Sequence, residues 1–417
     1  MMRLIMAWLI STMLLWGADA TIEVIKKVDS LPSIAVEDAS VSFTDTTSKR
    51  FFRLLVSDLN VLALFNVERD YATINFENNQ VTRENRVMDY VLRYRLRTDD
   101  HGAFISDVKL IRENETVLKK SYRVTNIKMN PFVAHKIAYD INSYFGADPV
   151  DWMKRKIIIS RLSGPHESEI VIADYTLSYQ HVIIKGGLNV FPKWADRDHK
   201  AFYYTSLSGK RPTLIMIDVR TGKRTKLLSS DGMLVCSDVS KDGKKLLLTM
   251  APAGQPDIYL YDVGSGKYSR ITKYSGIDVN GQFMEDGRIV FISNRLGYPN
   301  VFAKKPGSKS IEQMVYYGKS NSACTAHEEY IVYKARESSN AFSKNTFNLH
   351  LISTKTDFIR RLTATGVNEF PRFSKDGDAI IFVKNYKEQS SIGIIRLKRN
   401  KNFLFPLKFG KIQSMDW

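Results

Sequence analysis

The pattern of hydrophobic and polar positions changes character near residue 150. Before that point, apolar residues recur at three-to-four spacing over residues 46–63 and predict a helix there. A second helix is predicted from Pro131, because proline is tolerated in the first turn of a helix. Three segments between the helices alternate as strands do, over residues 90–97, 103–111 and 117–124. Residues 21–150 are therefore predicted to form a small N-terminal α/β domain.

Beyond residue 150 the helical spacing disappears, and short apolar runs alternate with clusters of Gly, Asp, Ser and Lys. A bulky or apolar residue opens the same short pattern six times, at Trp194, Val239, Phe283, Cys324, Phe373 and Trp417. These openers are 45, 44, 41, 49 and 44 residues apart. A period near 44 residues is typical of the four-stranded blade of a β-propeller. After Val239 an Asp-Gly pair predicts a tight turn, since glycine adopts positive φ at no steric cost.

The series of repeats is incomplete at both ends. Residues 156–185 contain the second to fourth strands of a repeat without an opener, and residues 413–417 supply an opener without the strands that should follow. Joining the two predicts a six-bladed β-propeller over residues 151–417, closed by the C-terminal strand. Closure pairs strand edges that would otherwise invite aggregation. The predicted fold class is thus α+β multidomain, with an N-terminal α/β domain followed by the closed propeller.

The first twenty residues predict a cleaved secretory signal. Arg3 precedes an apolar run over residues 4–16, and Ala18 and Ala20 are small residues at the positions that a signal peptidase reads. A membrane anchor is the alternative, but the run is shorter than the roughly 20 residues that span a bilayer. The mature chain is therefore expected outside the cytoplasm and not to span a membrane.

The charge balance narrows the choice of partners. The net charge of +17 favours anionic partners. Nucleic acid is not expected among them, because the signal directs the chain elsewhere and the basic residues are spread through the repeats. Acidic proteins, peptidoglycan and a membrane surface all stay open. The two cysteines, Cys236 and Cys324, are too few for a disulfide scaffold and are expected to be small buried residues.

The sequence carries no recognisable catalytic or metal-binding motif. The seven histidines are scattered, and His135 falls inside the second helix, where a helix-surface or capping position is expected. The Gly264–Lys267 segment lacks the spacing of a phosphate loop and lies between strands, so it is interpreted as a turn. We therefore expect no catalytic residue, no metal and no cofactor.

The order of these features resembles the TolB family. The repeats at residues 239–244 and 373–377 match that family's pattern of an apolar opener followed by Ser-x-Asp-Gly, and residues 132–141 look like the helix that ends its N-terminal domain. The resemblance implies a periplasmic, monomeric binding protein of the Tol-Pal system, which supports outer-membrane integrity and invagination during cell division.

The same resemblance implies the partners. The mature N-terminal segment would bind TolA through Thr21, Ile22, Glu23, Val24 and Ile25. The lipoprotein Pal, and in some bacteria imported colicins, would bind at the mouth of the propeller channel. A switch of the N-terminal segment between docking on the protein and binding TolA is one hypothesis, and a simple edge strand explains the segment equally well.

Propeller geometry selects the residues at that mouth. Connections from an outer strand to the next inner strand gather round one end of the channel, here residues 187–192, 230–238, 273–282, 319–323 and 365–371. The candidate partner-binding residues in them are polar at Asp278, Asn280, Asn368 and Glu369 and apolar at Val190, Phe191 and Met233. The rival interpretation is an extracytoplasmic propeller enzyme, a hydrolase or lyase, with its site in the channel.

Overall fold

The computed structural model describes residues 31–417 except 42, 84–85, 338–345 and 357. The predicted signal over residues 1–20 and the candidate TolA segment from Thr21 to Ile25 lie outside the described residues. Among the helices that are described, none has both the length and the apolar character needed to cross a bilayer.

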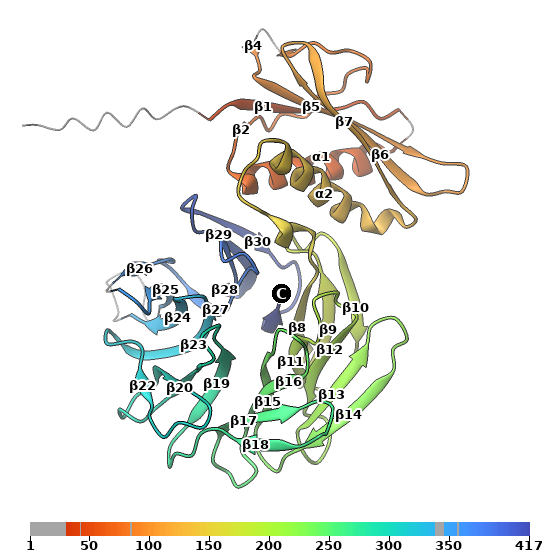
Figure 1. Ribbon diagram of the computed structural model, residues 1–417. Coiled ribbons are helices and arrows are strands. Elements are labelled where there is room, and N and C mark those ends of the chain that lie inside the picture. The colour runs from red at the N-terminus through yellow and green to blue at the C-terminus, as the bar shows by residue number, and fades with distance from the viewer. Residues whose placement is uncertain (1–30, 42, 84–85, 338–345, 357) are drawn as a thin grey trace, which may run out of the picture.

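The N-terminal part is a mixed sheet covered by two helices. The sheet has the order β2-β1-β5-β6-β7, with β1 parallel to β2 and β5 and the remaining pairs antiparallel. Its elements are β1 (Ser33–Asp38), α1 (Asp45–Leu62), β2 (Asn66–Val67), β5 (Tyr90–Thr98), β6 (Phe104–Arg112), β7 (Glu115–Val124) and α2 (Asn130–Tyr144), with the hairpin β3 (Thr82–Arg83) and β4 (Arg86–Val87) to one side. Both helices lie between this sheet and the rest of the molecule (Figure 1).

The predicted helices are confirmed. α1 buries Phe51, Leu55 and Leu59 on one face and ends where Ala63 adopts a left-handed conformation with φ 55. α2 has Pro131 in its first turn. α1 buries the apolar stripe that the sequence spacing predicted. α2 buries Ile137 and Ile141 of its expected stripe, whereas Tyr144 is 46% exposed.

The remainder of the chain forms small antiparallel sheets arranged in a circle, with the C-terminus near its centre (Figure 1). The short helices η1 (Ile127–Met129) and η2 (Asp151–Lys154) flank α2. The first three sheets are β8 (Ile157–Gly164), β9 (Glu167–Ala173), β10 (Gln180–Ile184) with β31 (Ile412–Asp416); β11 (Asn189–Trp194), β12 (Ala201–Ser206), β13 (Thr213–Asp218), β14 (Arg224–Ser229); and β15 (Leu234–Val239), β16 (Lys245–Met250), β17 (Asp257–Asp262), β18 (Tyr268–Arg270). The others are β19 (Asp278–Phe283), β20 (Ile289–Ser293), β21 (Asn300–Lys304), β22 (Glu312–Gln313), and an eight-stranded sheet of β23 (Lys319–His327), β24 (Tyr330–Arg336), β25 (Phe347–Ser353), β26 (Ile359–Arg361), β27 (Val367–Phe373), β28 (Ala379–Tyr386), β29 (Gln389–Arg396) and β30 (Lys401–Pro406).

Two pairings show how the sheets of this circle are joined. β31 pairs antiparallel with β8, with Met415 opposite Ile159 and Asp416 opposite Ile158. The last segment of the chain therefore supplies the inner strand of the sheet that β8 to β10 begin. Within the eight-stranded sheet, β25 and β27 meet through a single parallel pair of residues, so two antiparallel groups of four strands lie side by side.

The six openers of the sequence repeat lie toward the ends of the inner strands, not at their starts. Trp194, Val239, Phe283 and Phe373 each end a strand, and Trp417 directly follows β31. Each opener therefore marks the second half of an inner strand and precedes the turn that follows that strand. The Asp-Gly turns follow as predicted, and Gly243 has φ 72.

A continuous core and a buried polar cluster join the N-terminal part to the propeller. Trp152 of η2 packs edge-on against Trp417, with ring centroids 5.6 Å apart. His135 of α2 lies between Asp58 of α1, at 2.8 Å, and Asp174 beyond β9, at 3.1 Å, and all three side chains are fully buried. His135 was expected at the helix surface or at a cap. It is buried instead, because α2 is covered by the propeller, a contact that its local sequence does not show.

Candidate functional site

The inner strands share one irregularity. β11, β15, β19, β23, β27 and β31 each carry a β-bulge against their neighbouring strand. At the bulges Phe191, Asn280, Ala323 and Phe370 have positive φ between 49 and 57. Residues other than glycine and asparagine seldom adopt this conformation unless the surroundings impose it, and such strain gathers at functional sites. All four residues line one pocket at the centre of the circle.

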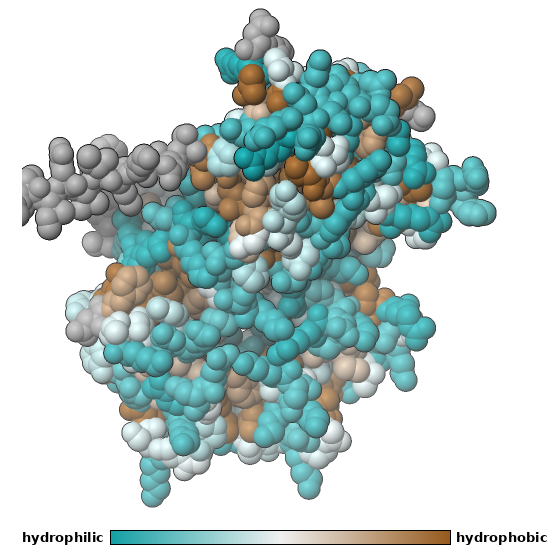
Figure 2. Space-filling model, turned by 45° about the horizontal axis from the view of Figure 1, so that its top comes forward, coloured by the Kyte–Doolittle hydropathy of each residue, from teal (hydrophilic) through white to brown (hydrophobic). Residues whose placement is uncertain are grey.

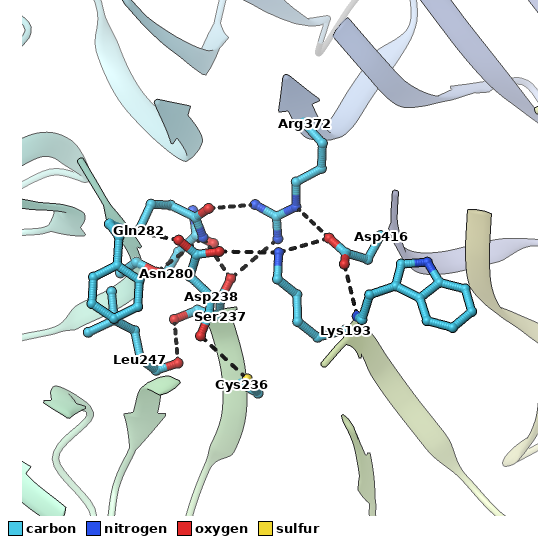
Figure 3. Close-up of polar contacts among 12 residues, drawn as sticks. Lys193, Cys236, Ser237, Asp238, Leu247, Asn280, Gln282, Arg372 and Asp416 are labelled. Atoms are coloured by element: carbon cyan, nitrogen blue, oxygen red, sulfur yellow. Dashed lines mark hydrogen bonds and ion pairs between the residues drawn. The ribbon is translucent and has the colours of Figure 1, made fainter. Parts of the chain in front are cut away.

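Beyond the bulges, polar side chains of the inner strands meet across the centre of the channel (Figure 3). Lys193 contacts Asp416 at 2.8 Å and Asp238 at 3.4 Å. Arg372 donates to Gln282 at 2.9 Å and contacts Asp416 at 3.3 Å. We call these five residues, from five different inner strands, the channel brace.

The channel brace is held by complementary charge. Burial alone would raise the pKa of the Asp416 carboxyl group, but Lys193 and Arg372 outweigh it and hold that pKa below its usual range. Asp416 also accepts the backbone N–H of Trp194 at 3.0 Å, and Asp238 accepts that of Phe283 at 2.9 Å. Each carboxylate thus fixes the end of a neighbouring inner strand.

The channel brace divides the channel into two pockets, and Lys193 and Arg372 line both of them. The first, which we call the apolar mouth, has a volume of about 280 Å³ and is lined by the bulge residues together with Pro192, Met233 and Val235. The second, the charged mouth, has a volume of about 430 Å³ and is lined by the ends of the inner strands and the turns that follow them. The N-terminal part packs on the side of these turns, since Lys398 after β29 contacts Asp148 at 2.9 Å.

Eight exposed hydrophobic side chains lie on the side of the propeller where the apolar mouth opens, and one of them, Met233, lines it. They lie in or next to the connections that gather on this side, at Leu207, Met233, Ile277, Leu296, Tyr316, Tyr317, Tyr386 and Phe409. Phe409 is 78% and Tyr316 73% exposed. Of the exposed large hydrophobic residues described in the propeller, only Phe358 lies in a connection on the opposite side. The face visible in Figure 2 is mainly hydrophilic, with scattered hydrophobic patches.

The structure distributes the seven propeller residues predicted from the sequence over different environments. Phe191, Met233 and Asn280 line the apolar mouth. The side chains of the others are buried or engaged: Val190 is 6% exposed, Asp278 is fully buried and paired with Arg295 at 3.0 Å, Asn368 is fully buried, and Glu369 pairs with Lys334 at 3.1 Å. We therefore do not retain Asp278 and Asn368 as direct contacts.

Sequence reasoning missed the channel brace. The sequence did carry a signal for it. A charged or amide residue stands one position before an opener of the repeat at Lys193, Asp238, Gln282, Arg372 and Asp416. A charged or amide residue at this recurring position contrasts with the apolar residue that follows it. The bulges had no such signal, since backbone irregularity has no fixed residue type.

The fold and its two channel pockets define a β-propeller protein with an N-terminal α/β part. A family profile described as "TolB beta propeller domain" matches residues 156–417. The chain is 48% identical over 410 residues to the Tol-Pal system protein TolB of Wolinella succinogenes, covering 97% of each chain, and 42% identical over 419 residues to that of Campylobacter jejuni, covering 100% of each. A crystal structure of TolB from Acinetobacter baumannii superposes with a TM-score of 0.74 at 20% identity, covering 93% of this chain and 97% of that one. The chain belongs to the TolB family.

Proposed function

We propose that the chain is a component of the Tol-Pal system that works in the periplasm as a monomeric protein-binding platform. Its membership of the TolB family and the names of its relatives support the system. In this role it would support outer-membrane integrity and invagination during cell division. The work is binding, and the proposal assigns no catalytic residue, metal or cofactor.

The apolar mouth is the proposed binding site for Pal, and colicins would use the same surface where they are imported. The observation that carries the proposal is the set of eight exposed hydrophobic side chains on the same side of the propeller as a pocket with a strained, bulged rim. Desolvating such side chains drives protein association. Exposed lysines share this side at Lys185, Lys210, Lys273, Lys387, Lys408 and Lys411. A partner surface with apolar and acidic groups would be complementary.

The propeller is proposed to act as a rigid six-bladed ring over residues 151–417, with β31 completing the first blade and the N-terminal domain spanning residues 21–150. The pairing of β31 with β8 and the channel brace support this arrangement. Because the brace links five inner strands, the rim of the apolar mouth is held in place before a partner arrives. Preorganisation of this kind lowers the cost of binding.

TolA is proposed to bind the segment from Thr21 to Ile25, after removal of a signal over residues 1–20. The hypothesis of a switch makes Pal binding and TolA binding interdependent. Measuring the affinity of a TolA domain with and without saturating Pal tests it, because equal affinities exclude coupling.

Photocrosslinking in cells tests the platform itself. A crosslinking residue replaces Met233 or Asn280 at the apolar mouth, and Tyr268 on the outer strand β18 serves as the control position. We expect adducts with Pal from the first two positions and none from the third. The enzyme alternative predicts no protein adduct from the mouth, together with turnover of a peptide or glycan by the purified chain.

A further inference from the structure

The charged mouth contains a guanidinium group without a carboxylate in direct contact among the described residues, although the nearby Asp416 carboxylate favours its charged form. Arg155, just after η2, donates from one Nη to Nε2 of His199 at 2.9 Å, while its buried Nε has no hydrogen-bond partner. Within the described part of the chain no carboxylate lies at ion-pair distance from it. Burial lowers the pKa of Arg155, which marks the cost of holding this charge away from water.

His199 does not compensate that charge. Burial and the neighbouring Arg155 lower the pKa of His199 to about 4, so the imidazole is neutral at physiological pH and acts as an acceptor. The ring lies against that of Trp194, which lines the charged mouth, with the ring centroids 4.3 Å apart and the ring planes tilted by 33°. The hydrogen bond therefore orients the guanidinium group without neutralising it.

Other donors around the pocket also lack acceptors. The indole N–H groups of Trp194 and Trp417 are buried without a hydrogen-bond partner. Arg197 and Lys375 are exposed on the rim, and neither has a carboxylate partner among the described residues. Buried polar groups in folded proteins nearly always find a partner, so an excess of donors in one pocket calls for an explanation.

The acidic side chains of the charged mouth are already engaged. Asp196 accepts the N–H groups of Asp198, Lys200 and Ala201; Asp238 and Asp416 belong to the channel brace; Asp242 accepts from Ser240 and Lys244; and Glu285 pairs with Lys241. The pocket thus has hydrogen-bond donors without acceptors, whereas its side-chain carboxylates already accept hydrogen bonds or pair with lysine or arginine. This is the chemistry that recognises an oxyanion.

We propose that the charged mouth is a binding site for an oxyanion, a carboxylate or phosphate group, with Arg155 as its central contact. Arg197 and Lys375, exposed on the rim, would attract the anion from solvent. The site lies on the opposite side of the channel brace from the apolar mouth and is independent of the function proposed for that mouth.

Titrations of the folded chain test this site. Inorganic phosphate and citrate are added separately at constant ionic strength, while tryptophan fluorescence and thermal unfolding are followed. Saturable binding of phosphate alone identifies a phosphate site, and saturable binding of citrate alone identifies a carboxylate site. Arg155→Gln is expected to weaken the binding about tenfold, the effect of losing one charge-assisted hydrogen bond.

The matched control is Arg220→Gln, which removes an exposed arginine from the β13–β14 turn outside this pocket. It should bind as the unmodified chain does. If Arg155→Gln does not fold, Arg197→Gln on the exposed rim replaces it, with a weakening of about threefold expected from the loss of one nearby charge. The proposal is overturned if neither anion gives saturable binding, or if the pocket variant that folds binds as tightly as the control.

Discussion

The ammonium group of Lys193 lies 2.8 Å from the carboxylate of Asp416, and both side chains are buried in the channel. Lys193 lies on the inner strand β11, and Asp416 lies on β31 at the end of the chain. Their ion pair therefore joins two neighbouring sheets of the propeller. It also belongs to the channel brace, which separates the apolar mouth from the charged mouth.

Replacing Lys193 with methionine is expected to destabilise the chain by about 3 kcal/mol, because Asp416 would stay buried with Arg372 as its remaining charged partner. Urea unfolding measures the change. Lys200→Met removes a lysine whose pair with Asp198 is largely exposed, and it should leave the stability nearly unchanged. Equal effects of the two substitutions would contradict the structural role of the brace.

Deleting residues 413–417 should markedly lower the melting temperature and abolish Pal binding. The deletion removes most of β31, so β8 keeps only β9 as a partner and becomes an exposed edge. It also removes Asp416 from the channel brace and Trp417 from its contact with Trp152. Scanning calorimetry of both chains provides the comparison, and an unchanged melting temperature would refute closure by the C-terminal strand.

The buried cluster around His135 predicts an alkaline loss of stability. Burial lowers the pKa of His135, but Asp58 and Asp174 outweigh burial and raise it to about 10. Because this pKa is higher in the folded than in the unfolded chain, the protonated imidazole stabilises the fold. The stabilisation is complete below the unfolded pKa of about 6.5 and is lost as the pH rises through about 10. The stability difference between the unmodified chain and His135→Gln should therefore shrink between pH 7 and pH 10. A difference that stays constant over this range would show that the imidazole is neutral in the folded protein.

The repeat spacing predicted much of the propeller, because four-stranded sheets need apolar strands and tight turns at regular intervals. The Asp-Gly turn after Val239 and the pairing of the C-terminal segment with the segment after Lys156 were both accessible from pattern alone. In each case the signal is local or strictly periodic.

The site was harder to predict. Asp278 and Asn368 looked like solvent-facing polar residues, yet both are buried within the sheets. Position in a connection says which end of the channel a residue approaches, but not whether its side chain faces solvent. The bulges at Phe191 and Phe370 and the burial of His135 depend on contacts between segments far apart in the sequence.

The central claim is that the exposed side chains on the side of the apolar mouth bind Pal. The most direct test is a calorimetric titration of purified Pal into three variants: Tyr316→Ser and Phe409→Ser at the mouth, and Tyr268→Ser on the outer strand β18, where the side chain is 53% exposed. We predict that at least one mouth variant loses about 2 kcal/mol of binding free energy, roughly thirtyfold in affinity, while the outer-strand variant binds as the unmodified chain does. Unchanged affinity in both mouth variants, or an equal loss in all three, would contradict the claim.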